Sequence, residues 1–420
     1  MKYETIEEQL EKLGLHKINN IEECLRERFG ADRAAQIAAT WDKLADEADK
    51  SDEPGRQDRL YAYLNNEYDL SMMVSCYTDA DIIRTICSWL NDHTEYFGRR
   101  ILDVGCGTGI VSCMLAMMLP AADITAIDRS PECIKIANII KEKLGVTNIQ
   151  FADMSAEDIS APAAGNQAAD SSCIVSDLQI VNEHNIGKVS TFDTVFSART
   201  FHENIGIRYT DNVFLPFSRQ VEAYAQIYRE YCLKLVKLVS SGGTLVCIER
   251  NHMDTEYYSV LKEFSGCGMK IIAESLQELR CEESDFANKS VFQTFAFKRQ
   301  ALPSDTAVSE IFELWQARAF ADGDKPYMFT RPQADWYAEQ NMAGIISGYE
   351  TFAPNGMQVA KMAFLRIRED NENFIMYQAT VDNSGVQILP LTVLDDVQNA
   401  LLSRRSIDQA MGYSVTDMAE

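Results

Sequence analysis

One stretch constrains the fold of this chain more than any other, namely residues 101–109 with the sequence ILDVGCGTG. The apolar run at 101–104 predicts a buried strand, and three glycines follow it at alternating positions. Residues 110–119 are apolar enough to form a packed helix. Glycine suits such a turn because the turn adopts positive φ angles and because a ligand can then approach bare backbone. The stretch therefore predicts an α/β fold with a ligand beside its first strand.

Two further strands with acidic ends support this interpretation. Residues 123–127 predict a second strand that ends in Asp128, and residues 148–152 predict a third strand that ends in Asp153 and Met154. An acidic side chain about 20 residues beyond the glycine turn is where doubly wound sheets bind ribose hydroxyls. Because ligands of open α/β sheets bind at the carboxyl ends of the strands, we expect a nucleoside-containing ligand at this edge.

Together these residues resemble a known family, the class I S-adenosylmethionine (SAM)-dependent methyltransferases. The resemblance rests on D-V-G-C-G-T-G at 103–109, A-I-D-R-S-P at 126–131 and F-A-D-M at 151–154, and it extends over about residues 75–300. It implies a Rossmann-like sheet of seven strands, SAM as the cofactor and S-adenosylhomocysteine as the product. A nicotinamide-dependent enzyme is disfavoured because the spacing of its third glycine differs. A sheet of this family that has lost its ligand is left open.

The resemblance also implies roles for individual residues. Asp103 is expected to hold the amino group of the methionine part of the cofactor, directly or through water. Gly105 and Gly107 are expected to leave room for that part. Asp128 is expected to accept hydrogen bonds from both ribose hydroxyls, and Asp153 from the adenine amine. The remaining residues expected at the cofactor are Tyr77, Cys106, Gly109, Arg129, Met154 and Ser197.

The segment after the predicted fourth strand, S-A-R-T-F-H-E at 197–203, is the second informative stretch. In this family the segment faces the methyl group. Here it lacks the N-P-P-Y or D-P-P-Y motif of enzymes that methylate nitrogen, and it is more similar to that of small-molecule O- or C-methyltransferases. His202 is a candidate general base because the pKa of histidine lies near neutral pH, and Glu203 is a candidate to orient it or to bind substrate. Simple packing of His202 against the next helix is the alternative.

Three more residues are candidates for substrate binding. Arg199 is expected either to bind an anionic group of the substrate or to pair with an acid. Arg208 and Tyr209 lie in a loop at 207–216 whose position and chemistry suit the wall of a pocket. No metal site is expected, because the chain has no C-x-x-C motif and its five histidines are scattered.

The chain divides into three predicted regions. Residues 1–75 predict a helical region that either packs on the sheet or closes over the substrate as a lid. Residues 76–300 predict the methyltransferase domain. Residues 301–420 predict a C-terminal α+β module of unknown role. The elements expected in this module are a linker at 301–305, a helix at 307–320, strands at 359–368, 373–381 and 386–393, and a closing helix at 395–404.

Composition limits the partners and the location of the protein. A formal net charge of −24 repels phosphate backbones, so a nucleic-acid substrate is disfavoured. The 11 cysteines have no paired spacing, which predicts free thiols in a reducing cytoplasm. Residues 1–15 lack the apolar core of a signal peptide, and no apolar run approaches the ~20 residues that span a bilayer. We therefore expect a cytoplasmic enzyme without a membrane partner, and a homodimer is left open.

These observations lead to one main hypothesis and two alternatives. The main hypothesis is a SAM-dependent methyltransferase that moves a methyl group by in-line displacement to a small-molecule acceptor, with O or C favoured over N. No nucleophilic residue is needed, because the cofactor already carries the reactive methyl group. The alternatives are a protein methyltransferase that docks its partner through residues 301–420, and a non-catalytic SAM-binding assembly protein.

Overall fold

A computed structural model describes most of the chain. The described residues are 5–51, 53–155, 191–206, 214–250, 254–282, 289–300, 335, 338–339, 341–381 and 384–418. The chain forms two compact units. The first unit comprises residues 1–208, 229–251 and 263–305, and the second comprises residues 209–228, 252–262 and 306–420.

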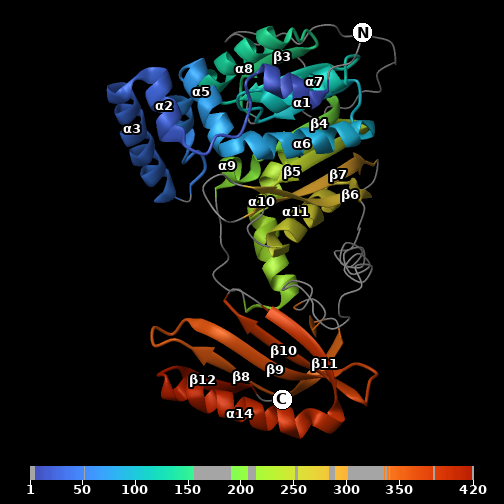
Figure 1. Ribbon diagram of the computed structural model, residues 1–420. Helices are drawn as coiled ribbons and strands as arrows, with labels where there is room; N and C mark the ends of the chain where they lie inside the picture. The colour runs from blue at the N-terminus through green and yellow to red at the C-terminus, as the bar shows by residue number, and fades with distance from the viewer. Residues whose placement is uncertain are drawn as a thin grey trace. The chain divides into compact units, whose positions relative to one another are not determined.

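A seven-stranded sheet in the order β3-β2-β1-β4-β5-β7-β6 forms the centre of the first unit (Figure 1). Neighbouring strands from β3 to β5 pair in parallel, whereas β7 runs antiparallel to both of its neighbours. The strands are β1 (Arg100–Val104), β2 (Asp123–Asp128), β3 (Ile149–Asp153), β4 (Phe192–Ala198), β5 (Val239–Glu249), β6 (Met269–Glu282) and β7 (Lys289–Arg299). The predicted Rossmann-like sheet, with its two closing antiparallel strands, is confirmed.

The register of the parallel strands brings their ends to one edge. Val104 at the end of β1 pairs with Ile127, and Asp128 at the end of β2 pairs with Asp153 at the end of β3. On the other side of β1, Val104 pairs with Ser197 of β4. The glycine turn, the two acidic strand ends and the segment after β4 therefore lie along the same edge, as the sequence predicted.

Helices cover both faces of this sheet. On one face, apolar residues of α6 (Ala80–Asp92), α7 (Ile110–Met118) and α8 (Pro131–Leu144) form a continuous core with buried strand residues. The other face carries α9 (Phe201–Ile205) and parts of α10 (Phe217–Leu238) and α11 (Asp254–Gly266). There the ring of Phe201 lies 5.3 Å from that of Tyr231 and 6.4 Å from that of Phe295, centroid to centroid. The strands whose ends form the candidate site are thus held between packed helices on both faces of the sheet.

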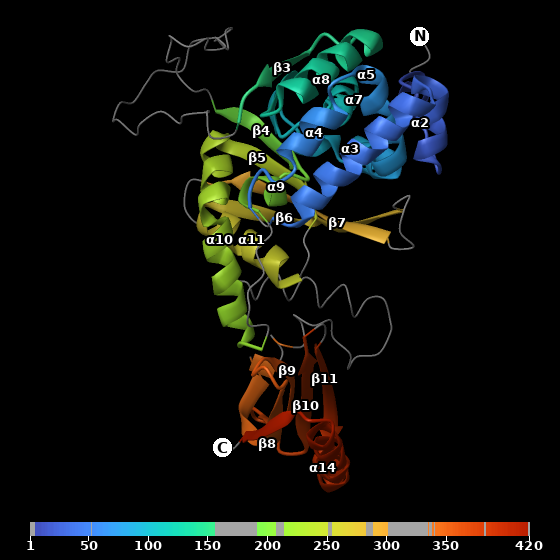
Figure 2. The same ribbon diagram turned by 90° about the vertical axis from the view of Figure 1, so that its left-hand side faces the viewer.

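The described residues before position 75 are mostly helical, as predicted. The helices are α1 (Ile6–Lys12), α2 (Ile21–Phe29), α3 (Ala31–Asp49), α4 (Asp58–Leu64) and α5 (Tyr68–Val74). Helices α4 and α5 contact α8 (Figure 2). Helix α1 contacts α6. Leu25, Ile37 and Leu70 belong to a small separate core between these helices. The N-terminal helices therefore pack against the sheet unit and are not a detached segment.

Helix α8 shows how local sequence sets an element at the site. Ser130 caps its start by accepting a hydrogen bond from the Cys133 amide at 3.2 Å, and Pro131 occupies the first turn. Gly145 ends the helix with a φ of 66°. Ser130 and Pro131 thus set the start of the helix, and they fix where the chain leaves β2.

Two elements of the first unit begin without a sharp boundary. The chain enters α6 from α5 through a π-helical turn, η1 (Ser75–Asp79), and Asp79 occupies the N-cap position of α6 without a side-chain hydrogen bond. A side-chain cap is unnecessary there because the helical path is continuous. Strand β5 begins at Val239, directly after α10, and a register shift between Phe192 and Thr194 accommodates its glycine-containing start.

The second unit contains a five-stranded antiparallel sheet in the order β11-β10-β9-β8-β12. Its elements are β8 (Met342–Phe352), β9 (Gln358–Ile367), β10 (Asn373–Thr380), β11 (Ser384–Pro390), α14 (Leu394–Ala410) and β12 (Ser414–Met418). Two short 3-10 turns complete the assignments, η2 (Thr94–Tyr96) in the first unit and η3 (Leu391–Val393) here. The α+β class of this module, its three predicted strands and its closing helix are confirmed.

Strands β8 and β12 were not predicted. Glycines interrupt the apolar pattern of β8, and an added Cβ at Gly348 would lie 2.4 Å from the Met362 carbonyl oxygen of the neighbouring strand. Strand β12 is short and largely exposed, so its sequence has no buried stripe. The predicted linker at 301–305 and helix at 307–320 lie outside the described residues.

Candidate functional site

The glycine turn after β1 forms the base of the candidate site. Gly105, Gly107 and Gly109 adopt φ angles of 74°, 53° and 74°. The amides of Gly105 and Cys106 donate hydrogen bonds to the carbonyl oxygen of Ile127, at 2.8 and 2.9 Å. These bonds attach the turn to the end of β2, and the half-buried Cys106 lies within it.

The three glycines have different neighbours. A Cβ added to Gly109 would lie 2.8 Å from the ring of Phe151, and one added to Gly105 would lie 2.4 Å from the methyl group of Thr200. A Cβ added to Gly107 would meet no atom within 4 Å. Gly109 therefore allows close packing of α7, Gly105 allows close approach of the segment after β4, and Gly107 faces open space in which a ligand can lie.

Asp128 closes the turn from β2. Its Oδ2 accepts a hydrogen bond from the Gly107 amide and its Oδ1 accepts one from the Ser130 amide, each at 2.9 Å. Burial raises the pKa of Asp128, and the two amides and Arg129 partly offset this effect. A carboxylate can accept roughly four hydrogen bonds, so both oxygens keep capacity for further donors such as ribose hydroxyls. This arrangement fits a nucleoside beside Gly107.

Asp103 and Asp153 lie on either side of this point. Asp103 is 3% exposed and accepts a hydrogen bond from the Ser112 hydroxyl at 2.6 Å, and burial raises its pKa to about 7. Asp153 is exposed at the end of β3, and the amide of Met154 donates to the Asp128 carbonyl oxygen at 2.9 Å. A cationic amino group placed near Asp103 would favour its ionised form.

Glu249 at the end of β5 organises the segment after β4. It is 1% exposed and accepts hydrogen bonds from the amides of Thr200 at 3.0 Å and Phe201 at 3.3 Å, and from the hydroxyl of Ser197 at 3.0 Å. The Thr200 hydroxyl is also bonded to that of Tyr231 at 3.1 Å. Glu249 thus fixes the start of α9, and burial raises its pKa to about 7.

The role of Glu249 did not follow from the sequence. The only signal for it is its position at the carboxyl end of the fifth strand. Its carboxylate accepts a hydrogen bond from the buried hydroxyl of Ser197. The Ser197 side chain therefore belongs to the network that holds the start of α9.

Arg199 has a left-handed backbone, with a φ of 62°, and its amide donates to the Ile248 carbonyl oxygen at 2.9 Å. Its guanidinium pairs with Asp79 at 3.0 Å and lies 6.0 Å from the ring centre of Phe292. The π-helical turn η1 thus supplies the acid that holds Arg199. Tyr77 lies in the same turn, with its ring edge-on to Trp41 at 6.3 Å.

His202 and Glu203 are neighbours in α9 but have different surroundings. Glu203 Oε1 accepts a hydrogen bond from the Tyr61 hydroxyl at 3.3 Å, and its backbone carbonyl oxygen accepts from the Gly55 amide at 3.2 Å and from Arg129 at 3.3 Å. Arg129 also pairs with Asp58 at 2.6 Å. The backbone carbonyl oxygen of His202 accepts a hydrogen bond from the Gly206 amide at 2.9 Å.

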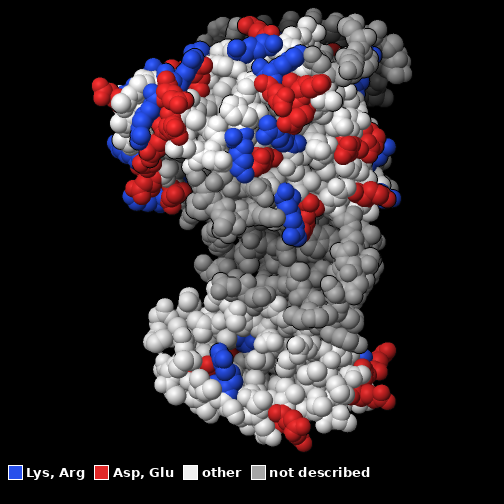
Figure 3. Space-filling view, viewed as in Figure 1, with Lys and Arg blue, Asp and Glu red and all other residues white. Residues whose placement is uncertain are grey.

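Two candidate residues, Arg208 and Tyr209, lie outside the described residues. Within the described ranges, no group of three or more His, Cys, Asp or Glu side chains is placed to hold a metal ion. No helix in the described part of the chain has the length and hydropathy to cross a membrane. On the face drawn in Figure 3, the described Lys and Arg side chains of the first unit lie among Asp and Glu side chains.

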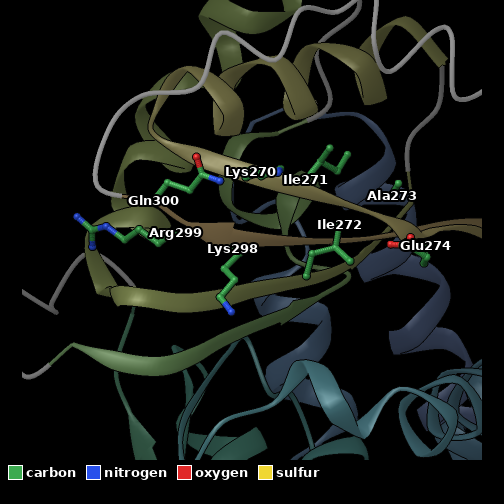
Figure 4. Close-up of a pocket in the computed structure, with 8 residues that line it drawn as sticks. All are labelled: Lys270, Ile271, Ile272, Ala273, Glu274, Lys298, Arg299 and Gln300. Carbon is green, nitrogen blue, oxygen red and sulfur yellow. The ribbon is translucent and has the colours of Figure 1, made fainter.

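A pocket is present at the opposite edge of the sheet (Figure 4). It is lined by Lys270, Ile271, Ile272, Ala273, Glu274, Lys298, Arg299 and Gln300. Lys298 pairs with Thr244 at the start of the main run of β5, far along that strand from Glu249. This pocket is therefore separate from the glycine turn, and nothing in its lining indicates a reaction.

Comparison with known proteins identifies the domain. Residues 97–278 match a family described as a methyltransferase domain. Among the sequence relatives, ubiquinone biosynthesis O-methyltransferase of Paraburkholderia phymatum is 36% identical over 73 residues, which is 17% of this chain and 30% of that protein. The enzyme of the same name from Xanthomonas axonopodis pv. citri is 37% identical over 78 residues, or 19% of this chain and 31% of that protein. The chain thus spans less than a third of the length of these curated relatives.

Solved structures show a weaker likeness. The magnesium protoporphyrin IX methyltransferase of Synechocystis PCC 6803, solved with bound SAM, is 14% identical, with a TM-score of 0.31. The match covers 67% of this chain and 98% of that one. A likeness at this level carries no argument about substrate.

The strand order, the glycine turn and the acidic strand ends define a nucleoside-binding α/β domain of the methyltransferase type. Residues 97–278 thus form a methyltransferase domain, in agreement with the resemblance to the class I SAM-dependent methyltransferases noted in the sequence. SAM is the cofactor of the family, and the open space at Gly107 and the spare acceptor capacity of Asp128 fit it.

Replacing Gly107 by alanine tests where the cofactor lies. Alanine at this positive φ should lower the free energy of unfolding by about 1–2 kcal/mol relative to glycine. The new methyl group would enter the ligand space, so SAM affinity in calorimetry should fall about tenfold or more. Gly145→Ala is the matched control, because its φ is 66° and its added Cβ also meets no atom within 4 Å. This variant should lose similar stability and bind SAM normally. Unchanged affinity in Gly107→Ala would contradict the placement.

Glu249 predicts a pH dependence of stability. Its pKa is about 7 in the folded state and 4.5 in the reference state, so between these values only the folded protein keeps the proton. The free energy of unfolding should therefore fall as pH rises through this window, by up to about 1.4 kcal/mol per pH unit. Glu249→Gln cannot ionise, so denaturant titrations from pH 4.5 to 7 should give it a flatter profile. Parallel profiles would show that Glu249 does not titrate there.

Proposed function

We propose that this protein transfers the methyl group of SAM to a small-molecule acceptor by in-line displacement, with oxygen or carbon favoured over nitrogen. The observation that carries the proposal is the joined glycine turn and Asp128 at the strand ends of a class I methyltransferase domain. The segment after β4, which lacks the motif of nitrogen methylation, supports oxygen or carbon. The curated relatives are named O-methyltransferases, which favours oxygen.

In this proposal the chain's own residues bind and align. SAM, when bound, supplies a methyl group on a positively charged sulfur, and displacement needs the accepting atom in line with it. Asp128 would hold the ribose, Asp103 the amino group and Asp153 the adenine amine. Glu249 holds the start of α9 through two backbone amides, and it thereby fixes the helix that carries His202 and Glu203. Either side chain could accept the proton that leaves the acceptor.

The other predictions about the whole protein stay predictions. They are the domain boundaries at 75/76 and 300/301, the cytoplasmic location, the homodimer, and the lid role of the N-terminal helices. The protein-methyltransferase and assembly-protein alternatives are distinguished by the experiment that follows.

Asp128→Asn tests the proposal at its cofactor. The variant loses the charge that strengthens hydrogen bonds to ribose hydroxyls, so SAM affinity should fall about tenfold or more in calorimetry. Asp123→Asn is the matched control, because Asp123 is exposed at the opposite end of the same strand. It should bind SAM normally. Unchanged affinity in Asp128→Asn would exclude this site for the cofactor.

Release of S-adenosylhomocysteine from the wild-type protein then tests the acceptor class. The proposal predicts release with small hydroxyl-bearing acceptors. Release only with protein acceptors would favour the protein methyltransferase. Cofactor binding without release for any acceptor would favour the assembly protein.

A further inference from the structure

One polar atom beside the candidate site lacks a partner. Glu203 Oε2 is buried and has no hydrogen-bond partner among the residues that the structure describes. Native proteins rarely leave a buried polar atom unpaired, because it has lost water without gaining another donor. The arrangement is understandable if the atom serves a bound molecule.

The rest of Glu203 is firmly held. Tyr61 of α4 donates to Oε1, and Gly55 and Arg129 donate to the backbone carbonyl oxygen. Burial raises the pKa of the Tyr61 hydroxyl, which therefore stays a donor at neutral pH. These contacts fix the carboxylate and leave Oε2 free of any assigned donor.

Glu203 also lies close to the cofactor edge. Its carbonyl contact Arg129 directly follows Asp128 in the chain. Three residues earlier, at the N-cap of α9, the methyl group of Thr200 fills the space left by the missing side chain of Gly105. The carboxylate thus belongs to the segment that borders the glycine turn.

Four residues from different segments favour the ionised form of Glu203. Three are arginines, of which Arg56 precedes α4, Arg129 follows β2 and Arg199 follows β4. The fourth is the hydrogen-bond donor Tyr61 in α4. The three arginines and the Tyr61 hydrogen bond lower the pKa of Glu203, but burial outweighs them and raises it. The second oxygen is consequently a stronger proton acceptor than that of a surface glutamate.

We propose that Glu203 Oε2 binds the hydroxyl or amino hydrogen of the methyl acceptor and takes its proton during transfer, with Tyr61 as the positioning residue. The inference rests on the proposed methyltransferase function. It narrows the substrate class to small molecules whose accepting atom carries a hydrogen. It also assigns the proton to Glu203 and not to its neighbour His202.

The step balances without a further reactant. The accepting oxygen or nitrogen forms a bond to the methyl carbon, and the carbon–sulfur bond breaks with its electron pair left on sulfur. The hydrogen of the acceptor passes to Oε2 and then to solvent. The products are the methylated acceptor, S-adenosylhomocysteine and one proton.

A stability measurement tests the reserved oxygen without any acceptor. Thermal unfolding at pH 8 should show Glu203→Gln at least as stable as the wild type, because the change removes a buried carboxylate whose second oxygen has no donor among the described residues. Tyr61→Phe should be less stable, because it leaves Oε1 without its donor as well. Glu263→Gln is the control, since Glu263 is buried and accepts two hydrogen bonds from Arg229, at 3.0 and 3.2 Å. It should lower the melting temperature. An equal loss in Glu203→Gln would show a structural role and overturn the proposal.

Turnover tests the chemistry. The probes are phenol and aniline, with anisole and N,N-dimethylaniline as matched compounds whose heteroatom carries no hydrogen. With SAM present, the protein should release S-adenosylhomocysteine with phenol and aniline only. Glu203→Gln should lower kcat about 100-fold or more with unchanged SAM affinity, and should abolish the acidic limb of the pH–rate profile. Tyr61→Phe should shift that limb, because it removes the hydrogen bond that positions Oε1.

The outcomes separate the two proposals. If the wild-type protein did not bind SAM, the proposed function itself would be refuted. SAM binding with no release from any of the four probes would count against both proposals. Release with an unchanged kcat in Glu203→Gln would overturn only the role of Glu203.

Discussion

The candidate site depends on the attachment of the glycine turn to the end of β2. Amides at the start of the turn bond to the Ile127 carbonyl oxygen, and the Gly107 amide bonds to the Asp128 carboxylate. These contacts exist only because β1 and β2 are parallel neighbours whose ends are in register. Strand order, glycine spacing and the acidic strand end are therefore one constraint, and a change in any of them would open the turn.

Several carboxylates are buried at this edge of the sheet. Asp103 and Glu249 both have pKa values of about 7, and Glu203 has a raised pKa. Each burial costs stability at neutral pH, because the charged form has lost water. Asp103 and Glu249 recover part of that cost through hydrogen bonds, whereas Glu203 keeps one oxygen unpaired. The cost is concentrated where a cationic cofactor and a proton-releasing acceptor would bind.

Local signals explain what the sequence could predict. The apolar run before Gly105 and the acids at the ends of β2 and β3 act within a few residues of their own position. They place the edge of the sheet correctly. The family match then confirms the domain that these signals indicate.

The remaining features arise from contacts between distant segments. Tyr61 and Glu203 are 142 positions apart, and Asp79, at the end of a π-helical turn, pairs with the distant Arg199. Glu249 becomes a capping group through the pairing of β4 with β5. Glycines interrupt the apolar pattern of β8, so this strand was not predicted from the sequence. Its place in the sheet is set by pairing with β9 and not by its own hydrophobic pattern. Such roles follow from tertiary pairing, which periodicity in one sequence does not encode.

A crystal structure of the protein with S-adenosylhomocysteine would test the central claim most directly. The account predicts that the methionine part lies over Gly107 and that both ribose hydroxyls lie about 2.6–3.0 Å from the Asp128 carboxylate oxygens. A nucleoside bound elsewhere, or a ribose out of reach of Asp128, would contradict it.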